Sequence, residues 1–160
     1  MAQHNSNTGC LLIGYGNSIR TDDRLGHYVV EQVSEYLRAR LYKFRALTLP
    51  QLDVSLAEEL TGTNLVIFID ARDDDSDELV RCEQVFPGPE SPAAAHTTHT
   101  ISIQNLLRTT YHLYDSIPTC YAVMPKGYDF SIGETLSPDA LKSAEQARIQ
   151  ILTILHVPTS

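Results

Sequence analysis

The stretch "CLLIGYGNSIRTDDRLG", residues 10–26, joins an apolar run to a glycine turn that ends in two acids. The apolar run predicts a buried strand, and Gly14 and Gly16 let the chain turn sharply where that strand ends. Beyond the turn, apolar side chains recur at every fourth position: Leu25, Val29, Val33, Leu37 and Leu41. This period predicts a helix over residues 23–41. The stretch therefore predicts a strand–turn–helix unit.

Strand and helix patterns alternate through most of the remaining sequence. Runs rich in apolar, β-branched and aromatic residues predict strands over residues 43–49, 64–71, 78–86 and 119–125. Amphipathic runs predict helices over residues 53–60, 102–114 and 136–155. We expect a single α/β domain over residues 1–160, with residues 1–8 as a flexible tail. Its sheet is expected to be mostly parallel and twisted, with helices on both faces.

Three of the expected helices carry a residue suited to the N-cap: Asp53, Ser102 and Ser137. Such a side chain accepts a hydrogen bond from a free backbone N–H of the first turn. Pro138 follows Ser137 at the first helical position, where a helix needs no N–H donor.

The chain of 160 residues is long enough to bury a full core, and 42% of its residues are hydrophobic. Its formal net charge of −8, from 12 basic and 20 acidic residues, disfavours binding to nucleic acid or to an anionic membrane. Cys10, Cys82 and Cys120 form no CxxC motif, so we expect reduced thiols. The polar start "MAQHNSNTG" has no signal-peptide core, and the longest apolar run, residues 65–69, is too short to span a membrane. These features predict a cytoplasmic protein.

A phosphate-binding loop is one interpretation of residues 14–26. A dinucleotide-binding loop has a third glycine three residues after the second, where this chain has Ile19. Asp22 and Asp23 would also lie at the helix N-terminus and repel a pyrophosphate. The sequence therefore disfavours a nucleotide site.

Carboxylates instead gather at one edge of the expected sheet, because ligand sites of open parallel sheets lie beyond the carboxyl ends of the strands. Asp22 and Asp23 follow the first strand, and Asp70 ends the central strand "VIFID". Neighbouring carboxylates repel each other unless a proton or a cation lies between them. The loop "HTTHT" offers His96 and His99 as nitrogen ligands. One imidazole with two carboxylates suits a borderline divalent metal.

Each of these residues also has an ordinary structural interpretation. Asp23 alone suits a helix cap, Asp70 suits a turn after a strand, and a loop histidine is usually solvated. The acidic run "RDDDSDE" at residues 72–78 is typical of a solvated loop. From composition and spacing alone, the sequence indicates an α/β domain with a candidate metal site.

Five motifs, in this order, resemble those of the hydrogenase maturation endopeptidases: "IGYGNSIRTDDRLG", "PQLDVSLAEEL", "VIFIDA", "THTISIQNLL" and "LSPDALKSAEQARI". Together they extend over nearly the whole chain. Members of this family remove the C-terminal extension from the large subunit of nickel–iron hydrogenases. The resemblance implies a three-layer α/β/α sandwich and the same reaction. In that reaction the protease recognises the nickel already loaded into its substrate and cuts just after the C-terminal cysteine motif.

The resemblance implies that Asp23, Asp70 and His99 are the metal ligands. Some relatives have Glu in place of Asp23, and commonly Gly in place of Arg24. His96 remains an alternative to His99, because the loop would have to shift by only three residues. The implied metal is nickel supplied by the substrate, so the purified protein would be empty or would hold another divalent ion.

The resemblance also implies that the partner is the hydrogenase large-subunit precursor, and we expect a monomer. The sequence has no GxSxG elbow and no HExxH helix, so cleavage would depend on Asp23, Asp70 and His99. Either the metal or a carboxylate would activate the water. Two other functions stay open. One is a hydrolase with a resident metal that acts on a small molecule, and the other is a non-catalytic chaperone module that senses nickel.

Overall fold

The computed structural model describes residues 8–89 and 101–160. Its strands are β1 (Thr8–Tyr15), β2 (Arg45–Leu49), β3 (Thr63–Ile69), β4 (Val80–Val85) and β5 (Thr119–Pro125). Its helices are α1 (Leu25–Ala39), α2 (Leu56–Thr61), α3 (Ile103–Tyr114) and α4 (Pro138–Ile154), with a short 3-10 turn, η1 (Asp22–Arg24), before α1. The order of these elements confirms the predicted alternation of strands and helices.

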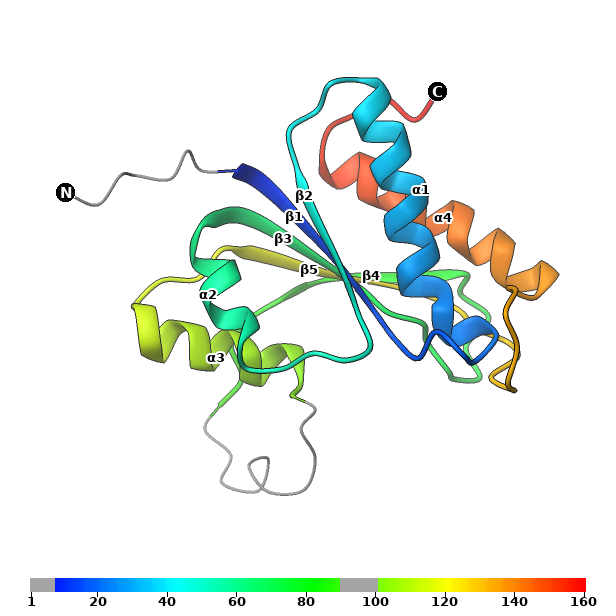
Figure 1. The fold of residues 1–160 in the computed structure, drawn as a ribbon, viewed down its shortest axis with the longest axis horizontal. Helices are drawn as coiled ribbons and strands as arrows, with labels where there is room; N and C mark the ends of the chain where they lie inside the picture. Colours follow the sequence, from blue (N-terminus) through cyan, green and yellow to red (C-terminus); the bar gives the residue numbers. More distant parts are fainter. Residues whose placement is uncertain (1–7, 90–100) are drawn as a thin grey trace.

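The strands form one sheet in the order β2-β1-β3-β5-β4. β2, β1, β3 and β5 run parallel, and β4 pairs antiparallel with β5 at one edge. α1 and α4 cover one face of the sheet, and α2 and α3 cover the other (Figure 1). The predicted three-layer α/β/α sandwich with a mostly parallel sheet is therefore confirmed.

β1 and β3 read as continuous apolar runs because both of their faces are covered by helices. On β1, Leu12 belongs to the core cluster beneath α1 and α4, whereas Leu11 and Ile13 belong to the cluster beneath α2 and α3. On β3, Ile67 and Phe68 divide between the two clusters in the same way. All five side chains are almost completely buried. The two central strands thus carry the core of both layers.

The predicted bounds of the first helix are wrong at both ends. The helix begins at Leu25 rather than Asp23, because the three residues before it form the tighter turn η1. It ends at Ala39, and Leu41, which the periodicity placed on the buried face, is 92% exposed. Leu41 adopts a left-handed conformation with φ 56°, a backbone geometry that terminates helices.

Two of the three predicted caps are confirmed. The side chains of Ser102 and Ser137 each accept a hydrogen bond from the first turn of the helix that follows, at 3.1 and 3.3 Å, and Pro138 begins α4. The prediction for Asp53 is wrong, because Ser55 occupies the cap position of α2. The side chain of Asp53 instead accepts a hydrogen bond from the backbone N–H of Ser55 at 2.8 Å, which closes a local turn between these two residues.

Two glycines let α1 begin in direct backbone contact with the sheet. A Cβ atom at Gly14 would collide with the backbone of Gly26. A Cβ atom at Gly26 would collide with the carbonyl groups of Ile69 and Tyr15. The first turn of α1 therefore rests on the carboxyl ends of β1 and β3, which Asp23 and Asp70 follow.

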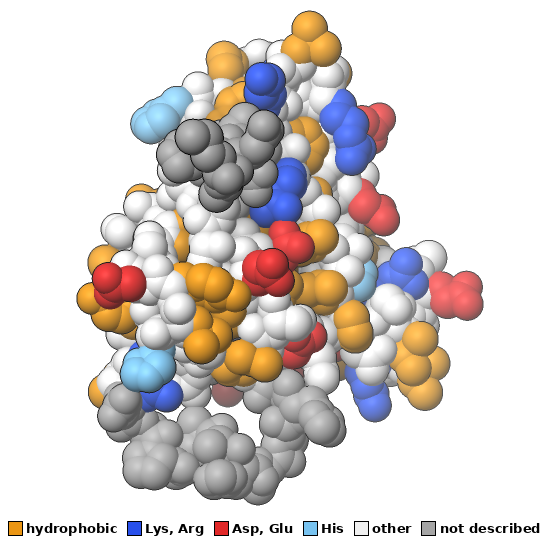
Figure 2. Space-filling view, turned by 60° about the vertical axis from the view of Figure 1, so that its left-hand side comes forward, with side chains coloured by type: hydrophobic (Ala, Val, Ile, Leu, Met, Phe, Trp, Pro, Cys, Tyr) orange, Lys and Arg blue, Asp and Glu red, His pale blue; other side chains and the backbone are white. Residues whose placement is uncertain are grey.

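One face of the molecule carries mixed charge (Figure 2). On the face seen in Figure 2, acidic, basic and hydrophobic side chains of the described residues are interspersed. Mixed charge of this kind gives that face no broad attraction for a polyanion. Within the described parts of the chain, none of the helices has the length and apolar character that crossing a membrane requires.

Gly26→Ala is expected to lower the free energy of unfolding by about 2–4 kcal/mol, because the new methyl group would push α1 off the backbone of β1 and β3. Gly62→Ala is the matched control, since a Cβ atom there meets nothing within 4 Å. Its effect should stay within about 0.5 kcal/mol. Urea unfolding followed by circular dichroism measures both variants, and equal losses would contradict this account of the backbone contact.

Candidate metal site at the carboxyl edge of the sheet

Asp23 and Asp70 lie at the carboxyl ends of two adjacent parallel strands. Asp23 belongs to η1, which follows β1, and Asp70 is the first residue after β3. The backbone N–H of Asp70 donates to the carbonyl of Val123 on β5 at 3.3 Å, so this residue still follows the line of the sheet. The negative charge of Asp23 contributes to a raised pKa of Asp70. Asp23 and Asp70 thus follow adjacent strands, close enough for the charge of one to affect the pKa of the other.

Gly16 and Asn17 fix the position of Asp23. Gly16 has φ 147°, a conformation that L side chains rarely adopt, and a Cβ atom there would collide with the backbone carbonyl of Asp23. The backbone N–H of Asn17 donates to Asp23 Oδ2 at 2.8 Å. The glycine turn therefore bends the chain back so that η1 lies over the end of β1.

The neighbouring acid, Asp22, has a structural role. Its side chain is completely buried and accepts four hydrogen bonds. The backbone N–H groups of Tyr128 and Asp129 donate to Oδ2 at 2.7 and 2.8 Å. Ser137 donates its N–H to Oδ1 at 2.9 Å and its hydroxyl to Oδ2 at 2.7 Å. Asp22 therefore ties the start of α4 and the segment before it to η1, and it has no capacity left for a ligand.

The environment of Asp70 disfavours its charged form. Burial, and next the charge of Asp23, raise the pKa of Asp70 from its ordinary 3.8 to about 7. Tyr15, the last residue of β1, lies near this carboxylate, since burial and then the charge of Asp70 raise the pKa of its phenol. Tyr15 therefore stays protonated beside the carboxylate pair. The sequence interpretation missed it, although its place between Gly14 and Gly16 is a signal that would have found it.

Among the described residues, no Lys, Arg or His forms an ion pair with Asp23 or Asp70. Arg24, the departure from the family motif, donates Nη1 to the carbonyl of Ser18 at 3.1 Å. Two carboxylates that repel each other and have no cationic partner are suited to bind a cation.

A complete ligand set is not visible in the part of the chain that the structure describes. No group of three or more His, Cys, Asp or Glu side chains suited to a metal ion occurs in residues 8–89 and 101–160. His96 and His99 lie outside the described residues, so the nitrogen ligand stays a prediction. Of the predicted three-residue set, Asp23 and Asp70 are the members that the structure describes.

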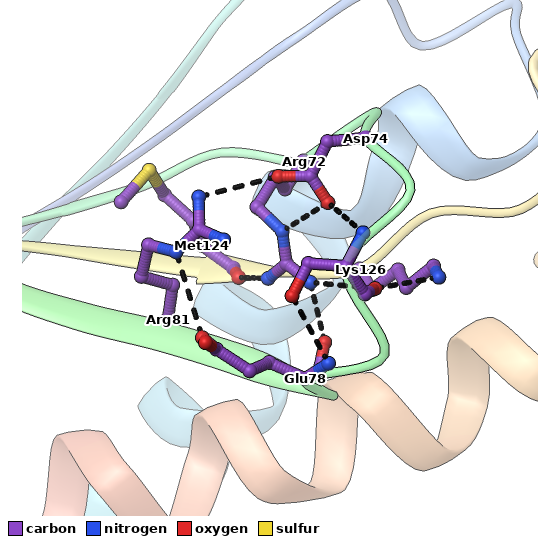
Figure 3. A network of polar contacts seen from close by, with 7 residues as sticks. Arg72, Asp74, Glu78, Arg81, Met124 and Lys126 are labelled. Atoms are coloured by element: carbon purple, nitrogen blue, oxygen red, sulfur yellow. Dashed lines mark hydrogen bonds and ion pairs between the residues drawn. The ribbon is translucent and has the colours of Figure 1, made fainter.

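Arg72 fixes the chain that leaves Asp70. Its guanidinium is only 6% exposed, and it donates Nε to Asp74 Oδ1 at 2.9 Å and Nη1 to the carbonyl of Met124 on β5 at 3.0 Å (Figure 3). The hydrogen bond from Arg72 lowers the pKa of Asp74. Lys126 extends the network, because its ammonium group donates to a backbone carbonyl of the same loop at 2.7 Å. The acids of residues 72–78 are mostly exposed, as predicted for a solvated loop, but the buried arginine that holds the loop was not predicted.

The cysteines offer no nucleophile to this site. All three are free, and Cys10 and Cys120 are buried in the core. Burial raises the pKa of both thiols to about 12. Burial, and then the charge of Glu83, also raise the pKa of Cys82. Thiols in such environments stay protonated and are poor nucleophiles.

Comparison with known proteins gives matches among solved structures. No family model and no curated protein matches the chain. The chain superposes on the hydrogenase maturating endopeptidase HybD from E. coli with a TM-score of 0.69 at 16% identity, covering 92% of each chain. It also superposes on the hydrogenase 2 maturation peptidase from a Thaumarchaeota archaeon with a TM-score of 0.64 at 19% identity, covering 94% of this chain and 99% of the other.

A third structure agrees with these two. The NiFe hydrogenase maturation protease HycI from Thermococcus kodakarensis matches with a TM-score of 0.64 at 20% identity, covering 95% of each chain. Because the identities are low and the coverage is nearly complete, the comparison establishes a shared fold over almost the whole chain. The fold that the motif resemblance implied is therefore confirmed.

The two adjacent acids should respond differently to neutralisation. Asp22→Asn is expected to lower the free energy of unfolding by about 3 kcal/mol, because its new amide NH₂ faces buried N–H donors. Asp23→Asn should change stability by about 0.5 kcal/mol or less, since the retained oxygen can still accept from Asn17. Urea unfolding at neutral pH measures both. A larger loss for Asp23→Asn than for Asp22→Asn would reverse the assigned roles.

Asp70→Asn is expected to stabilise the protein in a pH-dependent way. The folded-state pKa of Asp70, about 7, lies above its ordinary 3.8. Above both values the carboxylate is charged whether the chain is folded or unfolded, and its charge destabilises the folded state. At about pH 8 the free energy of unfolding of the variant should therefore be about 1–2 kcal/mol higher than that of the wild type.

As the pH falls from 7 towards 4, the folded wild type takes up a proton first, so its penalty disappears and the advantage of the variant shrinks towards zero. Urea unfolding of both proteins across this range measures the difference. A constant difference at all pH values would exclude Asp70 as its source.

Proposed function

We propose that this protein is an endopeptidase that removes the C-terminal extension from a nickel-loaded large subunit of a nickel–iron hydrogenase. One observation carries the proposal. Asp23 and Asp70 lie together, without a described cationic partner, at the positions where the motif resemblance expects metal ligands. The fold shared with HybD and HycI over at least nine-tenths of each chain supports the same function.

In the proposed reaction, Asp23, Asp70 and His99 coordinate the nickel that the precursor carries. Two carboxylates and one imidazole leave coordination positions for the ligands that the substrate itself supplies. Nickel binding would relieve the repulsion between the carboxylates, which is the source of part of the raised pKa of Asp70. The enzyme would therefore bind the loaded precursor in preference to the empty one.

Hydrolysis adds the oxygen of water to the carbonyl carbon of the scissile peptide, and the leaving nitrogen takes up a proton. Holding the peptide beside the carboxylate pair lowers the barrier through orientation. Where the carboxylate, rather than the metal, activates the water, Asp70 is the candidate base, because its pKa is about 7 when no cation is bound to it. A bound nickel centre would supply polarisation of the carbonyl. Tyr15 stays protonated and is able to donate a hydrogen bond beside the site.

The surface around η1 is suited to a protein substrate. Ile19 and Ile132 are 61% and 79% exposed. They belong to neighbouring segments, joined by the hydrogen bond from the N–H of Gly133 to the carbonyl of Ile19 at 2.9 Å. Exposed apolar side chains beside a polar site are typical of docking surfaces. With a net charge of −8, the protein is expected to meet a basic face of its partner. The proposal also includes a monomer that acts in the cytoplasm.

Cleavage of the precursor tests the proposal directly. The purified protein is incubated with nickel-loaded and with nickel-free large-subunit precursor, and the products are weighed by mass spectrometry. We expect loss of one C-terminal peptide from the loaded precursor only. Binding without shortening would instead indicate the chaperone module, and tight retention of a metal by the protein alone would indicate the small-molecule hydrolase.

Single substitutions then test the ligand set. Asp23→Asn, Asp70→Asn and His99→Ala should each lower kcat/KM by roughly 100-fold or more, because each removes a ligand. His96→Ala is the matched control from the same segment. Normal processing by all three ligand variants would refute the site assignment, and a larger loss for His96→Ala than for His99→Ala would move the nitrogen ligand to His96.

A further inference from the structure

β2 is an edge strand with free backbone groups. The carbonyl of Leu49 accepts the N–H of Gly16 at 3.1 Å, so Leu49 faces β1. Alternate residues of a strand direct their N–H and C=O groups to the same side. Arg45 and Leu47 therefore also face β1, whereas Ala46 and Thr48 direct both groups away from the sheet. No other described strand pairs with this side of β2.

A groove of about 400 Å³ runs between this edge and α1. Its lining residues come from β2 and from one side of α1: Val30, Glu31, Ser34, Glu35, Arg38, Ala46 and Thr48. Ser34 is only 3% exposed, and its hydroxyl has no hydrogen-bond partner among the described residues. A buried hydroxyl without a partner is uncommon in folded proteins and indicates a polar group still to be satisfied. Both residues of β2 with free backbone groups thus lie in the same groove as an unsatisfied side chain.

The carboxyl end of β2, beside the groove, lies close to η1. Glu31 also lines a second cavity of about 360 Å³, which reaches Ser18 and Arg24 beside η1. His27 on α1 lines the same cavity, and its Nε2 is 2.9 Å from the carbonyl of Leu49 at the carboxyl end of β2. Leu49 also accepts the N–H of Gly16, and Gly16 lies against the backbone carbonyl of Asp23, so a chain that leaves the free edge at Leu49 emerges close to Asp23.

We infer that this groove binds the C-terminal extension of the precursor as an added β-strand, an inference that rests on the proposed function. The extension follows the scissile bond, so its chain starts at the carboxyl edge of the sheet and runs antiparallel to β2. Ala46 and Thr48 each offer one donor and one acceptor, which is the pattern that an antiparallel partner requires. The backbone supplies these contacts whatever the sequence of the extension.

The distances suit a short connection. Adjacent strands lie about 4.8 Å apart, so a strand outside β2 runs about 10 Å from β1. An extended chain covers about 3.3 Å per residue. Roughly three residues therefore join the added strand to the carboxylate pair.

The charges of the groove favour a basic side chain on the extension. Glu31 and Glu35 line it with one opposing cation, Arg38. An extension residue that faces α1 would therefore lie beside two carboxylates, where Lys or Arg is favoured over Asp or Glu.

Thr48→Pro tests the inference, because proline removes an N–H that faces outward and leaves the ladder to β1 intact. We expect KM for nickel-loaded precursor to rise at least tenfold while kcat stays within about twofold.

The matched control is Gln84→Pro on β4, the strand at the opposite edge of the sheet. The carbonyl of Val123 accepts from Asp70, so the backbone groups of Val123 point to β3 and those of Ala122 and Met124 point to β4. Their partners on β4 are Glu83 and Arg81, so the backbone N–H of Gln84, the residue after Glu83, points away from β5. KM of Gln84→Pro should not change.

A second measurement needs no variant. Amide exchange of the wild type, followed by NMR, is recorded with and without a synthetic peptide of the extension sequence. The amides of Ala46 and Thr48 should exchange at least tenfold more slowly with the peptide present.

The outcomes separate this inference from the proposed function. A wild type that leaves the precursor uncut refutes the proposed function. Normal cutting with an unchanged KM for a folded Thr48→Pro variant, or unchanged exchange at Ala46 and Thr48, refutes only the added strand. A wild-type dimer in sedimentation that Thr48→Pro converts to a monomer would show that a second copy occupies the edge, and would also overturn the inference.

Discussion

The close contact between the start of α1 and the ends of β1 and β3 determines how the carboxyl edge of the sheet is built. Gly14 and Gly26 touch through their backbones, and Gly16 lies against the carbonyl of Asp23. Because no side chain separates these segments, η1 lies directly above the end of β1. This geometry places Asp23 near Asp70 on the neighbouring strand. A larger residue at any of the three glycines would move η1 away and separate the carboxylates.

The two adjacent acids show how the same chemical group serves stability in one place and a candidate function in the next. Asp22 is fully buried, but four donors compensate for its lost hydration, so its charge stabilises the connection to α4. Among the described residues, the Asp23 side chain accepts a hydrogen bond from Asn17, and Asp70 lies in an environment that raises its pKa to about 7. Among the described residues, no cation offsets the repulsion between Asp23 and Asp70, so this repulsion lowers the stability of the fold. Such a cost is typical of a site that is completed by its ligand.

The sequence predicted those features that depend on local patterns. The strands β1 and β3 follow from continuous apolar runs, and the caps of α3 and α4 from Ser102 and Ser137. The position of Asp23 and Asp70 after adjacent strands follows from the rule that parallel strands end at one edge. Features that depend on distant partners were not predicted. Asp22 binds a residue 115 positions away, and Arg72 binds a carbonyl 52 positions away. No local pattern distinguishes Asp22 from Asp23, or Arg72 from a solvated arginine.

The strand order explains why the site and the groove lie on either side of β1. From β1 the chain passes through α1 to β2 on one side, and then through α2 to β3 on the other side, so the topology reverses at β1. At such a reversal the two connections leave for opposite faces of the sheet and open a crevice above the strand ends. Asp23 and Asp70 follow β1 and β3, the strands at this reversal. β2, displaced to the edge by the same reversal, keeps one free side next to α1. The reversal of the strand order at β1 therefore has two consequences. It leaves a place for a cation beyond the ends of β1 and β3, and it leaves β2 as an edge strand close enough to guide an extended chain towards that place.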